Sequence, residues 1–271
     1  MIGRDWEIYR KCLLSKCLPK TQNVEIPSYR DLIMNKVLLA RWYSDWDRKK
    51  VGFYFLVKDD YFDIMSVGSH TRKKLNKAQK NFTIKIINPL DYIDELVDVT
   101  NAAFSDYPET YRPASVNKSI MLEEIEPDQI WLGAFSNEDN RLYGYAMREI
   151  EGNTVKMRCQ RVVPVAQKLR VNEALLRFCV EYFVNKKGYM LCEGAMNIAH
   201  QTQYHNFLIK NFGFRKMYCR LNVKYHPAVF LIVMLLYPLK NILMNVSNRY
   251  NLRNLYNIAV ILKQEAIRRD K

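Results

Sequence analysis

The sequence predicts an α+β protein in which a mixed, mostly antiparallel sheet carries helices on both faces, giving a three-layer α/β/α arrangement. Two observations predict this class. Hydrophobic residues make up 49% of the 271 residues and aromatic residues 13%, which is enough to build a globular core. In addition, the segment 155–214 alternates strand-like and helix-like patterns, and Pro164, Gly188 and Gly213 mark the ends of those elements.

The N-terminal part, residues 1–81, is expected to form an extension made of helices and one short hairpin. Residues 1–20 have the pattern of a basic amphipathic helix, and residues 28–48 that of a second helix with Trp and Tyr side chains on one face. The apolar run 51–57 predicts a strand, and residues 61–65 predict its return strand.

A basic helix is expected over 70–80, with Ser66 or Ser69 as its N-cap. A charged helix face is ordinarily solvated, and the alternative is contact with a phosphate-bearing acceptor. Beyond it, the spacing of apolar residues places the remaining elements. Strands are expected over 82–87, 130–135, 142–150, 155–163 and 189–192, and helices over 91–104, 116–124 (capped by Ser115), 165–185 and 200–211.

Charge is distributed unevenly along the chain. The net charge is +14, yet residues 91–150 carry a net −9. A basic chain of this kind suggests an anionic ligand or surface, which an anionic cofactor, an anionic membrane or a nucleic acid would satisfy. The acidic segment argues against a general nucleic-acid-binding protein, because such proteins gather positive charge and aromatic side chains on one face.

The six cysteines include no CxxC pair and no Cys/His cluster with metal-ligand spacing, so no metal site is expected. Buried free thiols in a reducing compartment are the simpler interpretation. The start of the chain lacks the long apolar core of a secretion signal. We therefore expect a cytoplasmic protein.

One segment, Ala228–Tyr237, is strongly apolar but shorter than the roughly 20 residues that span a bilayer. It is either a buried element that packs on the domain or an interfacial segment that docks on anionic lipid. In the second case residues 226–253 would hold the protein at the inner face of the membrane. The basic residues that flank the segment are Lys224, Lys240, Arg249 and Arg253.

Residues 82–225 resemble the GNAT acyltransferase fold, and within that superfamily they are most similar to the Fem-like branch of peptidoglycan-bridge aminoacyltransferases. Two stretches carry the resemblance. Residues 69–80, SHTRKKLNKAQK, are similar to the basic helix T-R-x-x-I-x-K-A-x-K of that branch, and residues 207–213, FLIKNFG, are similar to its helix end F-x-x-K-x-F-G. Residues 1–81 and 226–271 are then N- and C-terminal extensions of the acyltransferase domain.

The resemblance implies acyl-CoA or acetyl-CoA as co-substrate, with its pantetheine arm in a gap between two strands and its pyrophosphate at the N-terminus of the next helix. Where the family has Q/R-x-x-G-x-G/A, both glycines are absent, and Arg170 and Asn172 replace them. That departure fits a different donor, such as aminoacyl-tRNA. The cofactor-binding residues implied are Arg161, Val162, Val163, Gln167, Lys168, Leu169, Arg170, Val171 and Asn172.

Acyl transfer to an amine needs a base, donors for the oxyanion and an acid for the leaving group. Glu193, at the end of a strand, is the first candidate for the base, and His205 is the second. The family's catalytic Tyr position holds Ile209, so Tyr204 and His205, one turn earlier, are the candidates for the acid. The alternatives are a structural salt bridge for Glu193 and ordinary helix positions for Tyr204 and His205.

Three further residues are candidates for contacting the acceptor, and they are Tyr107, Tyr111 and Asn197. The function expected is a GNAT-fold N-acyltransferase acting on a small or lipid-linked amine, such as an amino sugar or a cell-envelope precursor. The alternative is a catalytically inactive GNAT-fold module that binds a ligand or a membrane. Nucleic acid is expected only as a tRNA donor.

Overall fold

The computed structural model describes residues 5–16, 18, 24–47, 52–107, 109, 112–199, 203–250 and 252–270. The chain forms two compact units. Unit 1 comprises Met1–Phe55, Ala195–Thr202 and Lys216–Lys271, and unit 2 comprises Leu56–Gly194 and Gln203–Arg215. The domain boundaries expected after residues 81 and 225 therefore fall inside units and do not separate them.

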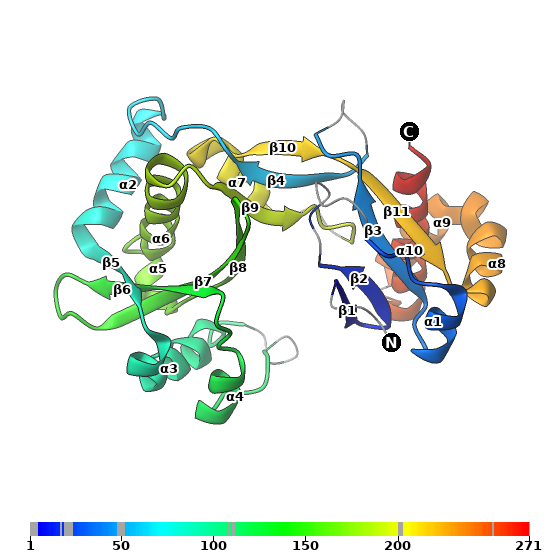
Figure 1. Cartoon of the computed structure of the whole chain (residues 1–271), viewed down its shortest axis with the longest axis horizontal. Coiled ribbons are helices and arrows are strands. Elements are labelled where there is room, and N and C mark those ends of the chain that lie inside the picture. The colour runs from blue at the N-terminus through cyan, green and yellow to red at the C-terminus, as the bar shows by residue number, and fades with distance from the viewer. Residues whose placement is uncertain are drawn as a thin grey trace. The chain divides into compact units, whose positions relative to one another are not determined.

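A seven-stranded sheet has the order β10-β4-β9-β8-β7-β6-β5 (Figure 1). Pairs β5/β6, β6/β7 and β7/β8 are antiparallel, and β8/β9 is parallel, so the sheet is mixed and mostly antiparallel as the sequence predicts. The strands are β4 (Tyr54–Lys58), β5 (Phe82–Ile87), β6 (Gln129–Ser136), β7 (Leu142–Glu151), β8 (Thr154–Val162), β9 (Met190–Ala195) and β10 (Arg215–Tyr218).

Helices cover both faces of this sheet in unit 2. Successive side chains of a strand point to opposite faces, and here the apolar side chains on each face pack against helices. On β6, Leu132 packs in one core with α2 (Ser69–Asn81) and α6 (Val171–Cys179). Its neighbour Trp131 packs in another core with α3 (Ile93–Ala103) and α4 (Lys118–Glu123). Helices α2 and α6 lie side by side (Figure 1). The three layers expected from the sequence are present.

The caps differ from the expected ones. Helix α2 begins at Ser69, and Gly68 stands at the N-cap, so the helix has no side-chain cap. The Ser66 hydroxyl instead donates to the carbonyl of Asp63. A short 3-10 helix, η1 (Pro89–Tyr92), precedes α3. Asn117, rather than Ser115, caps α4 through the backbone N–H of Ile120.

The single helix expected over 165–185 is wrong. This part of the chain instead forms three successive elements, which are α5 (Pro164–Gln167), α6 and a π-helical segment, η3 (Val180–Lys186). Arg170 adopts a left-handed conformation, with φ +75°, and thereby separates α5 from α6. Lys, Leu and Arg are good helix formers, so local propensity gives no sign of this break, and the tertiary structure imposes it.

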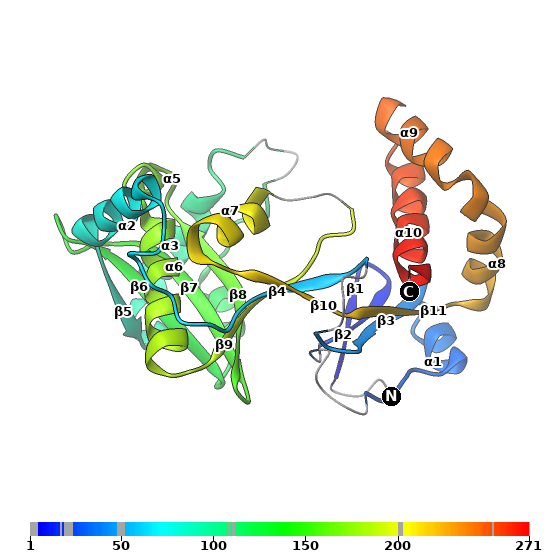
Figure 2. The same cartoon turned by 90° about the horizontal axis from the view of Figure 1, so that it is seen from above.

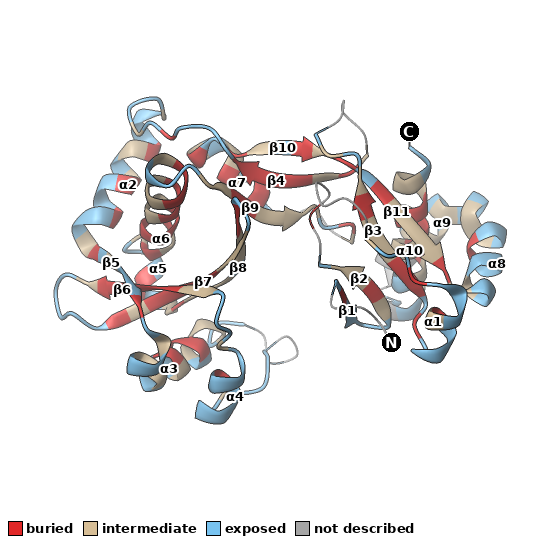
Figure 3. Cartoon of the chain, in the orientation of Figure 1, coloured by how far each residue is buried: buried red, intermediate tan, exposed pale blue. Residues whose placement is uncertain are grey.

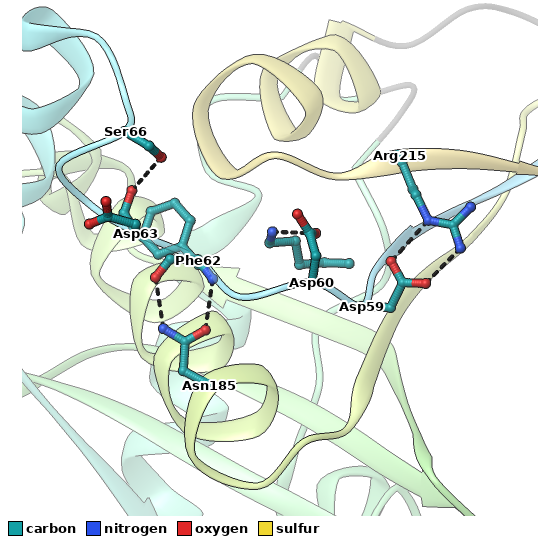
Figure 4. A network of polar contacts seen from close by, with 8 residues as sticks. Asp59, Asp60, Phe62, Asp63, Ser66, Asn185 and Arg215 are labelled. Atoms are coloured by element: carbon teal, nitrogen blue, oxygen red, sulfur yellow. Dashed lines mark hydrogen bonds and ion pairs between the residues drawn. The ribbon is translucent and has the colours of Figure 1, made fainter.

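The return strand expected over 61–65 is also wrong, because this segment is a turn. The backbone N–H and carbonyl of Phe62 both bond to the side-chain amide of Asn185, each at 2.8 Å (Figure 4). Nearby, Arg215 holds Asp59 with two hydrogen bonds of 2.9 and 2.6 Å (Figure 4). Side chains therefore bind this segment, and it does not extend a sheet.

Replacing Asn185 by Leu is expected to lower the free energy of unfolding by about 1–3 kcal/mol, because two backbone groups of Phe62 lose their partners in a partly buried place. Chemical denaturation followed by circular dichroism measures the change. Asn76→Leu, at an exposed position of α2, is the matched control and should change stability by less than about 0.5 kcal/mol. Equal stabilities for the two variants would show that the pair of bonds contributes nothing.

Unit 1 contains a four-stranded sheet of order β1-β2-β3-β11. The helix expected over 1–20 is wrong in the described part of that range, because residues 6–15 form an antiparallel hairpin whose turn, Arg10-Lys11, has two left-handed residues. The helix expected over 28–48 ends early, and its second half is a strand. The elements are β1 (Trp6–Tyr9), β2 (Cys12–Ser15), α1 (Tyr29–Met34), β3 (Leu39–Ser44) and β11 (Arg220–Tyr225).

The C-terminal part of unit 1 is helical, as the sequence predicts. It comprises α8 (Pro227–Leu236), a 3-10 turn η4 (Tyr237–Leu239), α9 (Lys240–Tyr250) and α10 (Arg253–Arg269). Helices α9 and α10 run side by side (Figure 2). Val233 of α8 and Leu262 of α10 share a core with Leu39 and Tyr225 of the sheet. These helices are therefore an integral part of unit 1.

Candidate active site

The parallel strands β8 and β9 pair over only three residue positions, from Thr154↔Met190 to Lys156↔Cys192. Beyond that point β8 continues to Val162 and stays paired with β7, while β9 continues to Ala195. The two strands therefore separate, as the resemblance to GNAT proteins implies. A gap of this kind exposes backbone groups and side chains of both strands to a ligand.

A cavity of about 570 Å³ opens where the strands separate, and all of its lining residues belong to unit 2. Strand β8 supplies one wall, the start of α6 a second, and β9 with α7 (Gln203–Phe212) a third. The lining residues are Arg148, Met157, Arg158, Cys159, Gln160, Arg161, Gln167, Arg170, Asn172, Glu173, Glu193, Tyr204 and Phe207.

Glu193 and His205 are in direct contact, with 2.5 Å between Oε2 of the carboxylate and Nε2 of the imidazole. Glu193 lies on β9, just beyond its last pair with β8, and His205 lies on the first turn of α7. The side chain of Glu193 is 21% exposed and that of His205 is 10% exposed. The structure thus joins the two bases expected from the sequence into one partly buried pair that can hold a proton beside the cavity.

Tyr204, a candidate acid, lines the same cavity and stacks on Phe207. Loss of hydration raises the pKa of its hydroxyl above the ordinary value. Arg148 opposes that rise in the pKa, whereas the charge of Glu193 adds to it. The phenol therefore stays protonated at neutral pH, which is the state that an acid requires.

Arg148 of β7 is a feature that sequence reasoning missed. It is 1% exposed, and its guanidinium donates to the carbonyls of Met147 and Cys159 and to the side chains of Gln160 and Cys179. All four acceptors are neutral, and within the described part of the chain no carboxylate forms an ion pair with it. A buried charge of this kind is costly unless something compensates it. One sequence feature could have indicated it: Arg148 lies two positions after Ala146 on an alternating strand, so its side chain falls on the same buried face.

The start of α6, where a pyrophosphate is expected, carries its own side-chain contacts. Arg170 donates to Glu173 at 3.2 Å, and the buried Glu173 carboxylate lies in the first turn of the helix. Asn172 accepts a hydrogen bond of 2.8 Å from Gln160. A negative charge therefore already occupies the end of the helix that favours anions.

The expected cofactor-binding residues fall into two groups. Four line the cavity, and they are Arg161, Gln167, Arg170 and Asn172. The other five do not line it. Val162 and Val171 are buried in the core, Val163 packs on the α3 side and donates its N–H to Tyr143, and Lys168 and Leu169 are exposed, with carbonyls that accept from Lys77 and Asn81.

Of the three residues expected to contact the acceptor, the two that the structure describes belong to different units. Tyr107 is exposed and packs edge-on against Phe104, whose ring lies 4.9 Å from the Arg161 guanidinium. Tyr111 lies outside the described residues. Asn197 belongs to unit 1, where its side chain accepts from the N–H of Ala199 in a local turn. Over the described ranges, no three His, Cys, Asp or Glu side chains gather as a metal site.

The fold is similar to that of several solved structures. One is L-PGS from Bacillus licheniformis, with 12% identity, a TM-score of 0.53, and coverage of 85% of this chain and 83% of that chain. Another is the C-terminal domain of a putative lysylphosphatidylglycerol synthetase from Agrobacterium fabrum, with 12% identity, a TM-score of 0.51, and coverage of 84% and 82%. FemX aligns with 9% identity and a TM-score of 0.47, over 71% of this chain and 67% of that chain.

No family model and no curated protein sequence matches the chain. The structural likeness defines a class of fold: the protein has the mixed α+β, GNAT-like fold that it shares with L-PGS and with the Agrobacterium fabrum domain. At these sequence identities the likeness concerns the fold alone.

Proposed function

We propose that this protein is a GNAT-fold N-acyltransferase, which moves an acyl group from an activated carrier to an amine acceptor in the cavity between β8 and β9. The observation that carries the proposal is the contact between Glu193 and His205 at the point where the two strands separate. A carboxylate and an imidazole paired beside a cavity form a unit that can accept and release a proton.

In the proposed reaction the Glu193–His205 pair takes a proton from the acceptor ammonium, and the neutral nitrogen attacks the carbonyl carbon of the donor. A new C–N bond forms, the nitrogen of that bond releases its second proton to solvent water, and the bond between the carbonyl carbon and the leaving sulfur or oxygen breaks. Tyr204 gives its proton to the leaving group and regains one from the Glu193–His205 pair through water. The tyrosine is suited to this step because its hydroxyl is protonated at neutral pH and its side chain lines the cavity.

Arg148 is suited to stabilising the negative charge that develops on the carbonyl oxygen. Its charge is fixed, buried and bound only by neutral groups, and it lies in the cavity wall. A preorganised cation in a site that excludes water stabilises such a charge more strongly than the same cation in water. The negative charge on the carbonyl oxygen would in turn compensate the buried guanidinium, which has no carboxylate partner among the described residues.

The identity of the donor is the second part of the proposal. The Glu173 carboxylate at the start of α6 is paired with Arg170, so a pyrophosphate placed there would have to compete with it for that guanidinium. This disfavours the usual CoA position and favours another activated carrier. An aminoacyl ester is one such carrier. The names of the neighbours from Bacillus licheniformis and Agrobacterium fabrum are in keeping with an aminoacyl group and a lipid-linked acceptor.

Thermal unfolding in the presence of acetyl-CoA, longer acyl-CoAs and aminoacyl-tRNA tests the donor. A carrier at about 100 times its dissociation constant should stabilise the protein by roughly 2.7 kcal/mol. Arg148→Gln should reduce this stabilisation, whereas Lys73→Gln, at an exposed position of α2, should not. Stabilisation by no carrier would contradict the transferase proposal and favour a non-catalytic binding module.

A further inference from the structure

An exposed apolar surface on the C-terminal helices of unit 1 is not used by the proposed reaction. Residues Pro227–Val246 form a helical stretch of 20 residues, within which a window of 18 residues has a mean hydropathy of 1.9 and is only 6% buried. Most of α8 is exposed in Figure 3. We propose that α8 is an interfacial docking element, which lies in the headgroup region of a bilayer that contains anionic phospholipid.

Helix α8 has apolar side chains on all sides, but only one narrow stripe of them packs on the protein. Val229, Val233 and Leu236 recur at the spacing of a helix face and contact the core of unit 1. The opposite side faces solvent, and Leu231 is 69% and Leu235 78% exposed. The large apolar residues exposed on this side are Phe230, Leu231, Ile232, Met234, Leu235 and Leu239. Contiguous exposed surface of this kind marks an interaction site.

The charges around α8 identify the partner as an anionic surface. No Asp or Glu occurs between His226 and Lys263. At the end of α8, the Nζ of Lys240 lies 4.5 Å from the ring centroid of Tyr237. The Cζ of Arg269, whose guanidinium is also paired with Glu265, lies 3.9 Å from the same centroid. At its start, Lys224 stacks on Tyr29 at 4.6 Å. Apolar side chains flanked by cations are complementary to a bilayer with anionic headgroups.

The same features indicate that α8 lies along the bilayer surface and does not cross it. One side of the helix is held against unit 1 by Val229, Val233 and Leu236. Only thirteen residues, Pro227 to Leu239, precede the charge of Lys240, and a crossing helix needs about 20. A helix held in this way can bury its outer side chains in the boundary between headgroups and acyl chains.

Flotation of the full chain with vesicles tests the inference. Vesicles of phosphatidylcholine mixed with phosphatidylserine, or with phosphatidylglycerol at the same charge density, should both carry the protein. Vesicles of phosphatidylcholine alone should carry much less. Raising salt from about 0.1 M to about 1 M should weaken binding, because the Debye length falls from about 10 Å to about 3 Å.

The double variant Leu231→Ser, Leu235→Ser should lower the partition coefficient at least roughly tenfold, because both side chains lose apolar burial in the bilayer. The matched control, Tyr61→Ser with Met65→Ser, removes two side chains that are also highly exposed but belong to unit 2. Lys240→Gln should weaken binding to anionic vesicles only, because it leaves the apolar surface intact. This single variant tests the inference if the double variant does not fold.

Three results would overturn the inference. The first is that the wild-type chain does not float with anionic vesicles. The second is that it floats with only one of the two anionic lipids, which would indicate a headgroup pocket instead of a charged surface. The third is that the wild type is an oligomer without lipid, that the double variant is a monomer, and that both float equally well. In that case a second copy of the chain, and not a bilayer, would cover α8.

Discussion

Replacing Glu193 by Gln is expected to slow acyl transfer by roughly 10²-fold or more. Gln keeps the size of the side chain and can still bond to His205, but it cannot share a proton with the imidazole. The rate would be measured with the carrier that stabilises the wild-type chain, and with an amino sugar such as glucosamine as acceptor. Glu181→Gln is the matched control, because Glu181 is paired with Arg177 on the same unit and does not line the cavity.

The pH dependence of this defect separates a catalytic role from a structural one. As pH rises, more of the acceptor amine is neutral in solution, so a missing base matters less and the defect should narrow. A variant that is merely misfolded would lose activity by the same factor at every pH. Wild-type activity in Glu193→Gln would remove Glu193 from the mechanism, and a defect that does not change with pH would remove its role as the base.

The second large effect is expected in unit 1, where Glu265→Gln should lower the free energy of unfolding by about 2 kcal/mol. Glu265 is 1% exposed and accepts hydrogen bonds from Arg268, Arg269 and the Tyr225 hydroxyl. Because both arginines are partly exposed, they regain hydration in the variant, and this limits the loss. Glu7→Gln, at an exposed position of β1, is the control for the charge change.

The effect of Glu265 should depend on pH with a definite sign. Burial alone would raise the pKa of this carboxyl, but the bonds from Arg268 and Arg269 outweigh burial and hold the pKa below its ordinary value. A lowered pKa contributes stability above the unfolded pKa of about 4.3 and loses it as pH falls through the folded value. Denaturation at neutral pH should therefore separate the wild type from Glu265→Gln, and the difference should shrink below about pH 4. A difference that stays constant down to that pH would contradict the ion-pair account.

The strands of unit 2 could be predicted because their signal is local. In 130–135 and 142–150 alternate residues face different cores, and a period of two is readable in a short window. In unit 1 the pairing joins residues distant in sequence, such as Val223 with Arg41. The turn of its first hairpin, Arg10-Lys11, adopts a conformation that Gly and Asn usually mark, so no residue signalled it. The helical appearance of residues 1–20 was therefore misleading.

The candidate site divides in the same way. The end of a strand at Glu193 and the start of a helix at Tyr204 and His205 could be read from the sequence, because element order places them at one edge of the sheet. That Glu193 and His205 touch, and that Arg148 has only neutral partners, could not be read. Arg148 meets groups up to 31 positions away, and such distances depend on how α6 packs on β7 and β8.

The sequence by itself determined the order of strands and helices from 82 to 214, the two faces of each strand, and the apolar, acid-free character of residues 227–246. These properties depend on residue type and on neighbours within a few positions. Only the tertiary structure decided where the strands separate, which charges are paired, and which side of α8 remains in solvent. Each of these depends on distances between residues far apart in the chain, and packing alone fixes such distances.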